Sequence, residues 1–220
     1  MNKIPFSPNT HIFLWDLHGV ILEKNLWDWF FMCLRFNRKA ELIKNLNKKT
    51  LSIAGTFLLE CLRLTKKQMV SEELIKAAEQ TNNQAFIDLT VKTCSSYKPT
   101  PATISLMKEL SDLGYAHHLG SNIGKTVFNN CAERFASVFD MFTEATIPFE
   151  CPQSGRIIKK PYPDFFHAHL KKHNLQPHHI IFIDDKLTNV HAAQAVGMHA
   201  IHFKNARDLR QQLVSYRILS

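Results

Sequence analysis

The run of residues 12–22, IFLWDLHGVIL, constrains the fold more than any other stretch of the chain. Four apolar residues lead directly into Asp16, and Gly19 follows three positions later. A short apolar run bounded by such a break is typical of a buried strand in a parallel sheet. A carboxylate at the carboxyl end of that strand lies where open α/β sheets bind ligands, although an Asp there can also simply begin a turn.

Length and composition are those of an ordinary globular protein. The 220 residues are 45% hydrophobic and 21% charged, enough for one large domain or a core with a smaller insert. Five cysteines lie scattered without CxxC spacing, which argues against a disulfide framework or a cysteine zinc site and for a reducing compartment. The sequence shows neither a signal peptide nor an apolar run long enough to span a bilayer, so we expect a cytoplasmic protein without a membrane partner.

The region after the first strand has a helical pattern. None of its apolar blocks alternates with a period of two, so residues 24–97 are expected to form an all-helical insert that ends at Pro99 and Pro101. The expected helices cover residues 26–36, 38–48, 51–64, 71–80 and 84–95.

The remainder of the chain alternates between helices and short apolar strands. Helices are expected at residues 102–113, 125–135, 162–173, 187–196 and 205–216, and strands at 115–119, 138–143, 180–183 and 199–203. This alternation predicts a parallel sheet with crossover helices. We therefore expect an α/β protein with a three-layer, Rossmann-like α/β/α core from residues 1–23 and 98–220, interrupted by the helical insert.

The charge of +8 is concentrated in the insert. Residues 24–99 hold 13 Lys and Arg against 7 Asp and Glu. Such a balance suits an anionic partner such as a small phosphorylated metabolite. The basic residues are not interleaved with aromatic ones in the patterns of nucleic-acid binders, which disfavours nucleic acid as a partner. No motif indicates an oligomeric state.

Polar side chains follow three of the expected strands: Asp16 to His18, Ser121 with Asn122, and Asp184 with Asp185. The carboxyl ends of parallel strands share one edge of the sheet, so these groups can converge in one crevice, which Lys160 can join from the start of a helix. Clustered carboxylates repel one another unless a hard divalent cation lies among them. Such a cation and a lysine would neutralise a phosphoryl group, and a carboxylate can serve as the nucleophile.

In this order the motifs resemble those of the haloacid dehalogenase-like (HAD) hydrolases, in the subfamily with a helical cap between the first two motifs. Asp16-Leu17-His18-Gly19-Val20 is similar to the first motif, usually Asp-x-Asp-Gly-Val/Thr. Ser121-Asn122 resembles the second and Lys160-Pro161-x-Pro163 the third. Asp184-Asp185 with Asn189-Val190 and Gly197 resembles the fourth. The match spans nearly the whole chain.

The resemblance implies a Mg²⁺ site. Asp16 would be both the nucleophile and a metal ligand. The backbone carbonyl of His18 would be a second ligand and Asp185 a third, with Asp184 bound directly or through water.

The resemblance also implies a phosphoryl pocket. Ser121 and the amide of Asn122 would bind the phosphoryl oxygens, and Lys160 would pair with both the nucleophile and the phosphoryl group. Gly19 is counted among the substrate-binding residues. Residues 24–97 would be a cap that closes over the substrate and excludes water.

Position 18 departs from the family pattern, because phosphatases of this family usually carry a second Asp there as the acid–base group. An imidazole ordinarily titrates near pH ~6.5 and can do this work. Three interpretations follow: His18 replaces Asp in a working phosphatase, it supports only slow turnover, or the chain is a non-catalytic protein that binds metal and phosphate. A fourth interpretation is a dehalogenase. The acidic pair Asp184-Asp185 disfavours it, because the dehalogenases of the family that the chain resembles need no metal and lack this pair.

The twelve histidines include two adjacent pairs, His117-His118 and His178-His179. Neighbours in a strand point to opposite faces and cannot chelate jointly, so packing and surface roles are expected.

Overall fold

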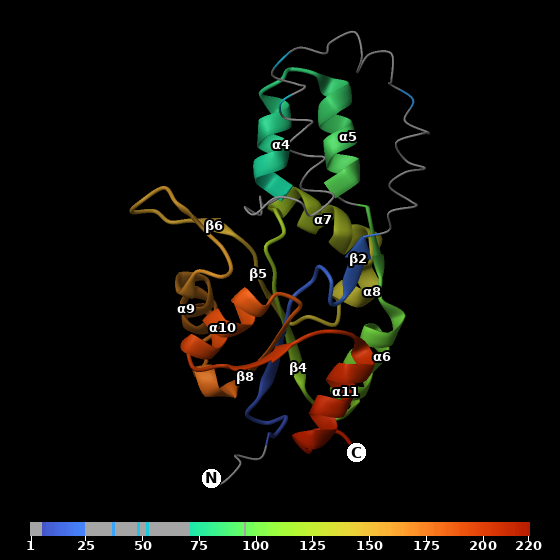
Figure 1. Ribbon diagram of the computed structural model, residues 1–220, viewed down its shortest axis with the longest axis vertical. Coiled ribbons are helices and arrows are strands. Elements are labelled where there is room, and N and C mark those ends of the chain that lie inside the picture. Colours follow the sequence, from blue (N-terminus) through green and yellow to red (C-terminus); the bar gives the residue numbers. More distant parts are fainter. Residues whose placement is uncertain (1–5, 25–36, 38–47, 49–51, 53–70, 95) are drawn as a thin grey trace. The chain divides into compact units, whose positions relative to one another are not determined.

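The computed structural model describes residues 6–24, 37, 48, 52, 71–94 and 96–220 (Figure 1). Its contacts divide the chain into two compact units. The first comprises Met1–Glu23, Lys98–Asn122 and Phe135–Ser220, and the second comprises Lys24–Tyr97 and Ile123–Arg134. The expected helices at 26–36, 38–48 and 51–64 lie outside the described residues apart from single positions. The assignment of residues 24–97 as a cap domain therefore stays a prediction.

The first unit carries the main sheet and most of the helices. Its sheet strands are β1 (Ile12–Trp15), β4 (Ala116–Gly120), β5 (Glu144–Thr146), β8 (Ile180–Asp184) and β9 (His199–His202). Its helices are α6 (Pro101–Asp112), α8 (Ala136–Phe139), α9 (Pro163–Lys172), α10 (Leu187–Ala195), α11 (Ala206–Ser215) and the 3₁₀ turn η1 (Pro177–His179). Short strands β6 (Phe149–Glu150) and β7 (Ile157–Ile158) pair antiparallel, and β2 (Leu22–Lys24) pairs with β3 (Tyr97–Pro99).

The main sheet has the order β5-β4-β1-β8-β9, and every pair in it is parallel. Trp15, the last residue of β1, lies opposite Leu119 of β4 and Ile183 of β8. The central strands therefore end level with one another, and the residues that follow them emerge at one edge. This confirms the predicted α/β class with a parallel sheet.

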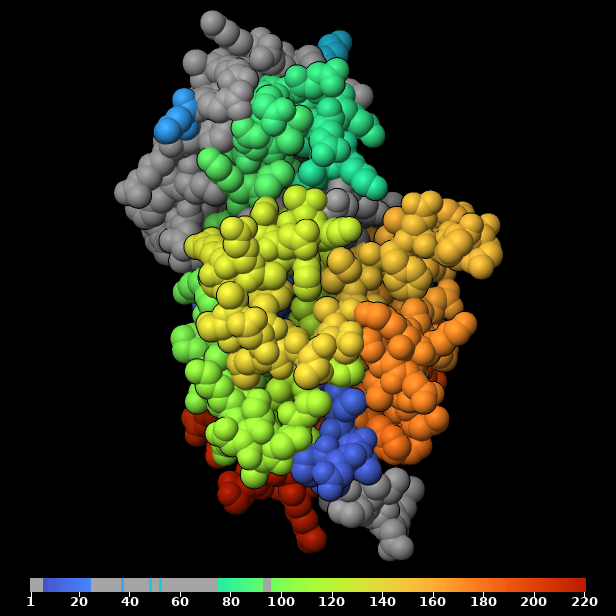
Figure 2. Space-filling view, turned by 180° about the vertical axis from the view of Figure 1, so that it is seen from behind, coloured from blue at the N-terminus to red at the C-terminus, as the bar shows by residue number. Residues whose placement is uncertain are grey.

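Helices cover both faces of the sheet (Figure 1). On one face Leu14 and Phe182 pack against Phe165 and Phe166 of α9 and against α10. All four of these side chains are fully buried, which is worth roughly 1.5–3 kcal/mol for each relative to exposure. Figure 2 shows α9, in orange, at the surface beside the gold segment that carries β6 and β7.

The opposite face is covered by α6 and α11. His117 of β4 contacts Ser111 of α6 through its Nε2, 3.0 Å from the hydroxyl. Arg210 of α11 forms a bidentate ion pair with Glu109 of α6 at the surface. With α9 and α10 on the other side, the core has the predicted three layers.

One expected strand, at residues 138–143, is wrong. The chain there forms the short helix α8 and turns, and the Phe139 and Phe142 rings meet edge to face at 6.2 Å. The next strand, β5, begins only at Glu144. A short apolar run cannot by itself distinguish a buried strand from a helical turn, because both lack a clear period over so few residues. The other predicted helices and strands among the described residues agree with the structure to within about two residues, a difference typical of element ends.

The described part of the second unit is mainly helical, although its end residues Lys24 and Tyr97 belong to β2 and β3, where an all-helical insert was predicted. It contains α4 (Ser71–Glu79), α5 (Gln84–Cys94) and α7 (Lys125–Arg134). The side chain of Asn83 caps α5, because its Oδ1 accepts a 3.0 Å bond from the N–H of Phe86. No helix within the described ranges is both long and apolar enough to cross a membrane.

Candidate active site

Asp16 lies directly after β1, at the centre of the sheet. Its side chain is only 6% exposed, and its backbone N–H donates a 2.8 Å hydrogen bond to the carbonyl of Ile183 in β8. The parallel pairing thus continues one residue past the strand. The carboxylate is therefore fixed at the sheet edge where ligands bind in such folds.

Lys160 reaches this carboxylate from the segment before α9. Its buried Nζ lies 2.8 Å from Asp16 Oδ1 and 2.6 Å from Asp184 Oδ2, so one ammonium bridges the ends of β1 and β8. Burial alone lowers the pKa of Lys160, but the two carboxylates together outweigh it and hold the pKa above its ordinary value. Lys160 is therefore a permanent positive charge in the site.

Asp184 is held on both of its oxygens. Oδ1 accepts bonds from the N–H of Lys186 at 2.8 Å and from Nδ2 of Asn189 at 3.0 Å, and Nδ2 also lies 2.9 Å from Oδ2. Burial raises the pKa of the Asp184 carboxyl; Lys160 opposes this effect and Asp16 adds to it. Lys186, Asn189 and Lys160 each donate a hydrogen bond to this carboxylate. The protein itself therefore fixes the orientation of the carboxylate.

Asn189 is a residue of this site to which the sequence assigned no role. It is 3% exposed and lies in the first turn of α10, from which it reaches back to the strand end. Asn189 lies in the fourth motif of the sequence, and its position five residues after Asp184 was the signal for its role, because one helical turn after a strand end can bring a side chain back to that end.

Asn122 and Ser121 follow β4. The Asn122 side chain bonds the backbone of Lys160 at both polar groups: Oδ1 accepts from its N–H and Nδ2 donates to its carbonyl, each at 2.8 Å. Ser121 Oγ is fully buried and has no hydrogen-bond partner among the residues that the structure describes. Such an unsatisfied hydroxyl is costly unless a ligand bonds it.

Asp185 completes a group of three carboxylates. Asp16, Asp184 and Asp185 each place one oxygen within 4.8 Å of the others. Gly19 has a φ of +86°, and a Cβ built on it would lie 2.5 Å from Oδ2 of Asp185. Only glycine allows the backbone to approach this carboxylate so closely. Clustered carboxylate oxygens suit a hard divalent cation such as Mg²⁺.

His18 lies between Asp16 and Gly19 with a half-buried side chain. The turn that it occupies is closed by a 2.7 Å hydrogen bond from the N–H of Gly19 to the carbonyl of Leu22. All eight residues predicted for the site lie in the first unit. The structure joins Asp16, Lys160, Asp184 and Asn122 by hydrogen bonds and sets Asp185 beside them; their catalytic roles stay predictions.

The model of the haloacid dehalogenase-like hydrolases matches residues 10–197, which include every one of these positions. The chain belongs to that family of hydrolases. Among curated proteins, the sesquiterpene phosphatase astK of Aspergillus oryzae is 32% identical over 115 residues, which are 52% of this chain and 56% of that protein. An uncharacterized protein of Schizosaccharomyces pombe is 28% identical over 137 residues, 56% of this chain and 55% of that protein. The chain thus spans little more than half the length of these curated relatives.

Solved structures share the fold. A HAD family enzyme of Bacteroides thetaiotaomicron superposes with a TM-score of 0.59 at 19% identity, covering 92% of this chain and 98% of that chain. The same enzyme with magnesium and inorganic phosphate gives a TM-score of 0.56, at 88% and 94% coverage. An L-2-haloacid dehalogenase of Xanthobacter autotrophicus with covalently bound chloropropionic acid gives 0.55 at 14% identity, with 95% and 84% coverage. These likenesses confirm the Rossmann-like HAD fold.

Proposed function

We propose that this protein is a Mg²⁺-dependent phosphomonoester hydrolase that uses Asp16 as its nucleophile. The observation that carries the proposal is the single buried ammonium of Lys160 among three carboxylates. One ammonium leaves two negative charges without balance. A divalent cation would neutralise them and allow an anionic phosphoryl group to enter.

The donor set fits Mg²⁺. Asp16 and Asp185 would hold the ion, together with the backbone carbonyl of His18, while Asp184 would act directly or through water. When bound, the ion would neutralise charge on the phosphoryl oxygens. The magnesium and phosphate bound to the Bacteroides enzyme, which shares the fold, support this assignment.

The chemistry of the chain itself follows in two steps. Asp16 attacks phosphorus, the bond from phosphorus to the ester oxygen breaks, and His18 donates a proton to that oxygen. Water then attacks the aspartyl-phosphate and gives its proton to His18, and phosphate leaves with the Asp16 carboxylate restored. Lys160 and the free hydroxyl of Ser121 would stabilise the phosphoryl oxygens in both steps.

The substrate class is a small phosphomonoester. Residues 24–97 would act as the cap, and their positive balance would suit an anionic substrate. The phosphatase of A. oryzae that matches half of the chain supports phosphate-ester cleavage and adds a terpenyl phosphate to the candidates. A cytoplasmic location remains a prediction.

A second candidate function is binding of metal and phosphate without turnover. The residue that favours it is His18, because a larger and differently titrating group replaces the usual carboxylic acid. The two candidates differ in what His18→Asp does: it would create turnover in a binding protein, whereas it would only shift the pH profile of a working enzyme.

A panel of phosphate esters tests both candidates. Sugar phosphates, nucleotides, phosphorylated cofactors and a terpenyl phosphate are assayed with Mg²⁺ and with EDTA. We expect metal-dependent release of phosphate that Asp16→Asn lowers by roughly three orders of magnitude or more. Asp140→Asn, at an exposed position, is the matched control and keeps full activity. Turnover that persists in Asp16→Asn contradicts the assignment of Asp16 as the nucleophile. If the wild type is inactive and His18→Asp is active, the result supports the second candidate, a protein that binds metal and phosphate without turnover.

A further inference from the structure

A second group of polar side chains lies on the sheet face covered by α9, away from the carboxylates. His118 of β4 occupies the same register row as Leu14 and Phe182, whose side chains pack against α9, and as Glu144 of β5. Residues paired in register point to the same face of a sheet. His118 and Glu144 are therefore neighbours under α9, whereas His117 points to α6.

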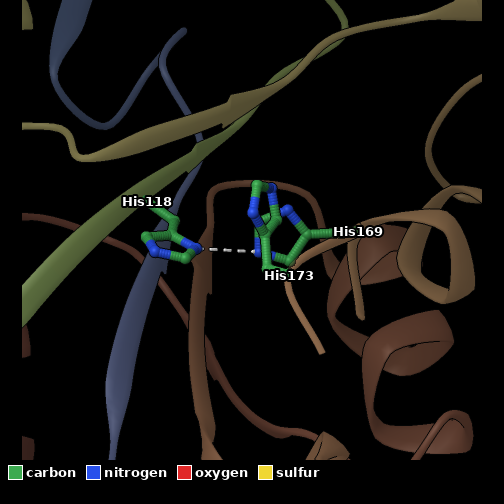
Figure 3. Close-up of side chains that lie close together, drawn as sticks. All are labelled: His118, His169 and His173. Atoms are coloured by element: carbon green, nitrogen blue, oxygen red, sulfur yellow. Dashed lines mark hydrogen bonds between the residues drawn. The ribbon is translucent and has the colours of Figure 1, made fainter. Parts of the chain in front are cut away.

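The end of α9 supplies two more imidazoles. His169 lies in the last turn of the helix and His173 is its C-cap, whose N–H bonds the carbonyl of His169, so the two side chains lie on one side of the helix end. The ring of His118 faces the rings of His169 and His173 (Figure 3), with centroids 5.2 Å apart for His118 and His169, 5.2 Å for His118 and His173, and 4.9 Å for His169 and His173. We call these three residues the histidine cluster.

The nitrogens of the histidine cluster converge. His118 Nδ1 and His169 Nε2 are 3.2 Å apart, and each of the three rings offers one nitrogen within 4.8 Å of the others. Zn–N bonds of about 2.0–2.1 Å at tetrahedral angles place two ligating nitrogens about 3.3–3.4 Å apart. The His118–His169 separation is thus already that of two ligands of one tetrahedral ion.

His173 supplies an independent observation. Its side chain is only 9% exposed, and its buried Nε2 has no hydrogen-bond partner in the described part of the chain. Oε2 of Glu144 lies 3.7 Å from this nitrogen, too far for a hydrogen bond. A buried imidazole nitrogen left in this state costs free energy that a ligand would recover.

His169 is prepared for coordination by its other nitrogen. Its Nδ1 lies 2.8 Å from the hydroxyl of Thr146, two residues after Glu144 on the same face of β5. A hydrogen bond from Nδ1–H to this oxygen leaves the Nε2 lone pair aimed at the cluster, the arrangement that outer-shell partners give to metal-binding histidines. Burial lowers the pKa of His169 to about 3 and that of His118 to about 4, so both rings are neutral at pH 7.

We propose that the histidine cluster, completed by the Glu144 carboxylate, binds one transition-metal ion of the Zn²⁺ type. Three imidazole nitrogens with one carboxylate oxygen match the N and O ligands that Zn²⁺ takes, whereas Mg²⁺ takes oxygen ligands. The ion would tie the edge strand β5 and strand β4 to the end of α9. Lys172 gives up its contact with Glu144, a 3.5 Å pair between exposed side chains that contributes little.

Metal titration of the full-length protein tests the proposal. Asp185→Asn serves as the background, because it weakens the carboxylate site without touching the histidine cluster. After chelation and dialysis, calorimetry with Zn²⁺ should give one equivalent that excess Mg²⁺ does not displace. Zn²⁺ should raise Tm by roughly 5–10 °C at about 100 times Kd, and Co²⁺ should give the visible absorption of a tetrahedral site.

Single substitutions locate the ligands. His173→Gln should weaken Zn²⁺ binding by about a hundredfold and Glu144→Gln by about tenfold. His167→Gln, on the exposed side of the same helix, should bind as the parent does. The proposal is overturned if His173→Gln binds Zn²⁺ as tightly as its parent, or if the Asp185→Asn protein binds no equivalent of Zn²⁺. The histidine cluster would then be only a hydrogen-bonded part of the core. If His173→Gln fails to fold, the Co²⁺ spectrum of the parent decides, because a non-tetrahedral spectrum contradicts the assignment.

Discussion

The side chain of Asn122 hydrogen-bonds both the N–H and the carbonyl of the Lys160 backbone, each at 2.8 Å. Asn122 follows β4, whereas Lys160 precedes α9, 38 residues later in the chain. These two bonds fix the backbone position from which the lysine side chain extends to Asp16 and Asp184. Asn122 is therefore a positioning residue for the ammonium.

Replacement of Asn122 by Ala should reduce both activity and stability. Loss of both bonds lets the Lys160 backbone shift, and a displacement of about 1 Å in a catalytic group costs about 10²-fold in rate. The free energy of unfolding should fall by about 1–3 kcal/mol, because two backbone groups lose their partner. Phosphatase kinetics and urea unfolding measure the two effects, with Asn129→Ala at an exposed site as the control. A kcat/KM equal to that of the wild type contradicts the positioning role.

Lys160→Met should destabilise the fold by about 3–5 kcal/mol, since it leaves two buried carboxylates without their shared cation. The loss should depend on pH. Burial already raises the pKa of Asp184, and removal of the ammonium raises it further. A folded-state pKa above the unfolded value favours the folded state at low pH, so the deficit should be smaller at pH 5 than at pH 8. Unfolding curves at both pH values, beside exposed Lys171→Met, check this; an equal deficit at both contradicts it.

Gly19→Ala should both destabilise the protein and weaken metal binding. The methyl group would lie 2.5 Å from Asp185 Oδ2 and displace that carboxylate. Gly114→Ala is the matched control: its φ of +89° is similar to the +86° of Gly19, but its Cβ would meet only Pro8, at 3.5 Å. Both variants share the backbone strain, so an additional loss of about 1–3 kcal/mol in Gly19→Ala reports the crowding. Equal losses would show that Asp185 moves aside freely.

Cys151 should react with alkylating reagents far faster than Cys131. Burial raises the pKa of the Cys131 thiol to about 11, so only about one molecule in a thousand is thiolate at pH 8. Hydrogen bonds from Ser154 and Gln153 lower the pKa of Cys151, which is only half-buried. Iodoacetamide labelling followed by peptide mass spectrometry at pH 7 and pH 8 distinguishes the two sites. Comparable rates in the native protein would contradict the burial of Cys131.

The alternation of apolar runs and helices was sufficient to predict the parallel sheet and the strand ends at Asp16 and Asp184. These are local properties, because an apolar run that stops at a polar residue marks the end of a buried strand wherever it occurs. The same argument failed at residues 138–143, where the run was too short to show a period. The packing role that it gave the histidines stays a prediction, but adjacency in sequence could not show that His118 meets His169 and His173 at the end of a distant helix.

By itself, then, the sequence determined the α/β class and the order of the motifs, and it predicted which carboxylates would lie together. Only the tertiary structure decided which side chains are in contact. Lys160 bonds Asp16, which is 144 residues away in the sequence, and His118 contacts His169, which is 51 residues away. Such contacts depend on strand register and on where each helix packs, and both are set by the burial of the whole core rather than by any local pattern. The sequence could therefore place Asn122 near the phosphoryl pocket, but only the folded chain shows its two hydrogen bonds to the Lys160 backbone.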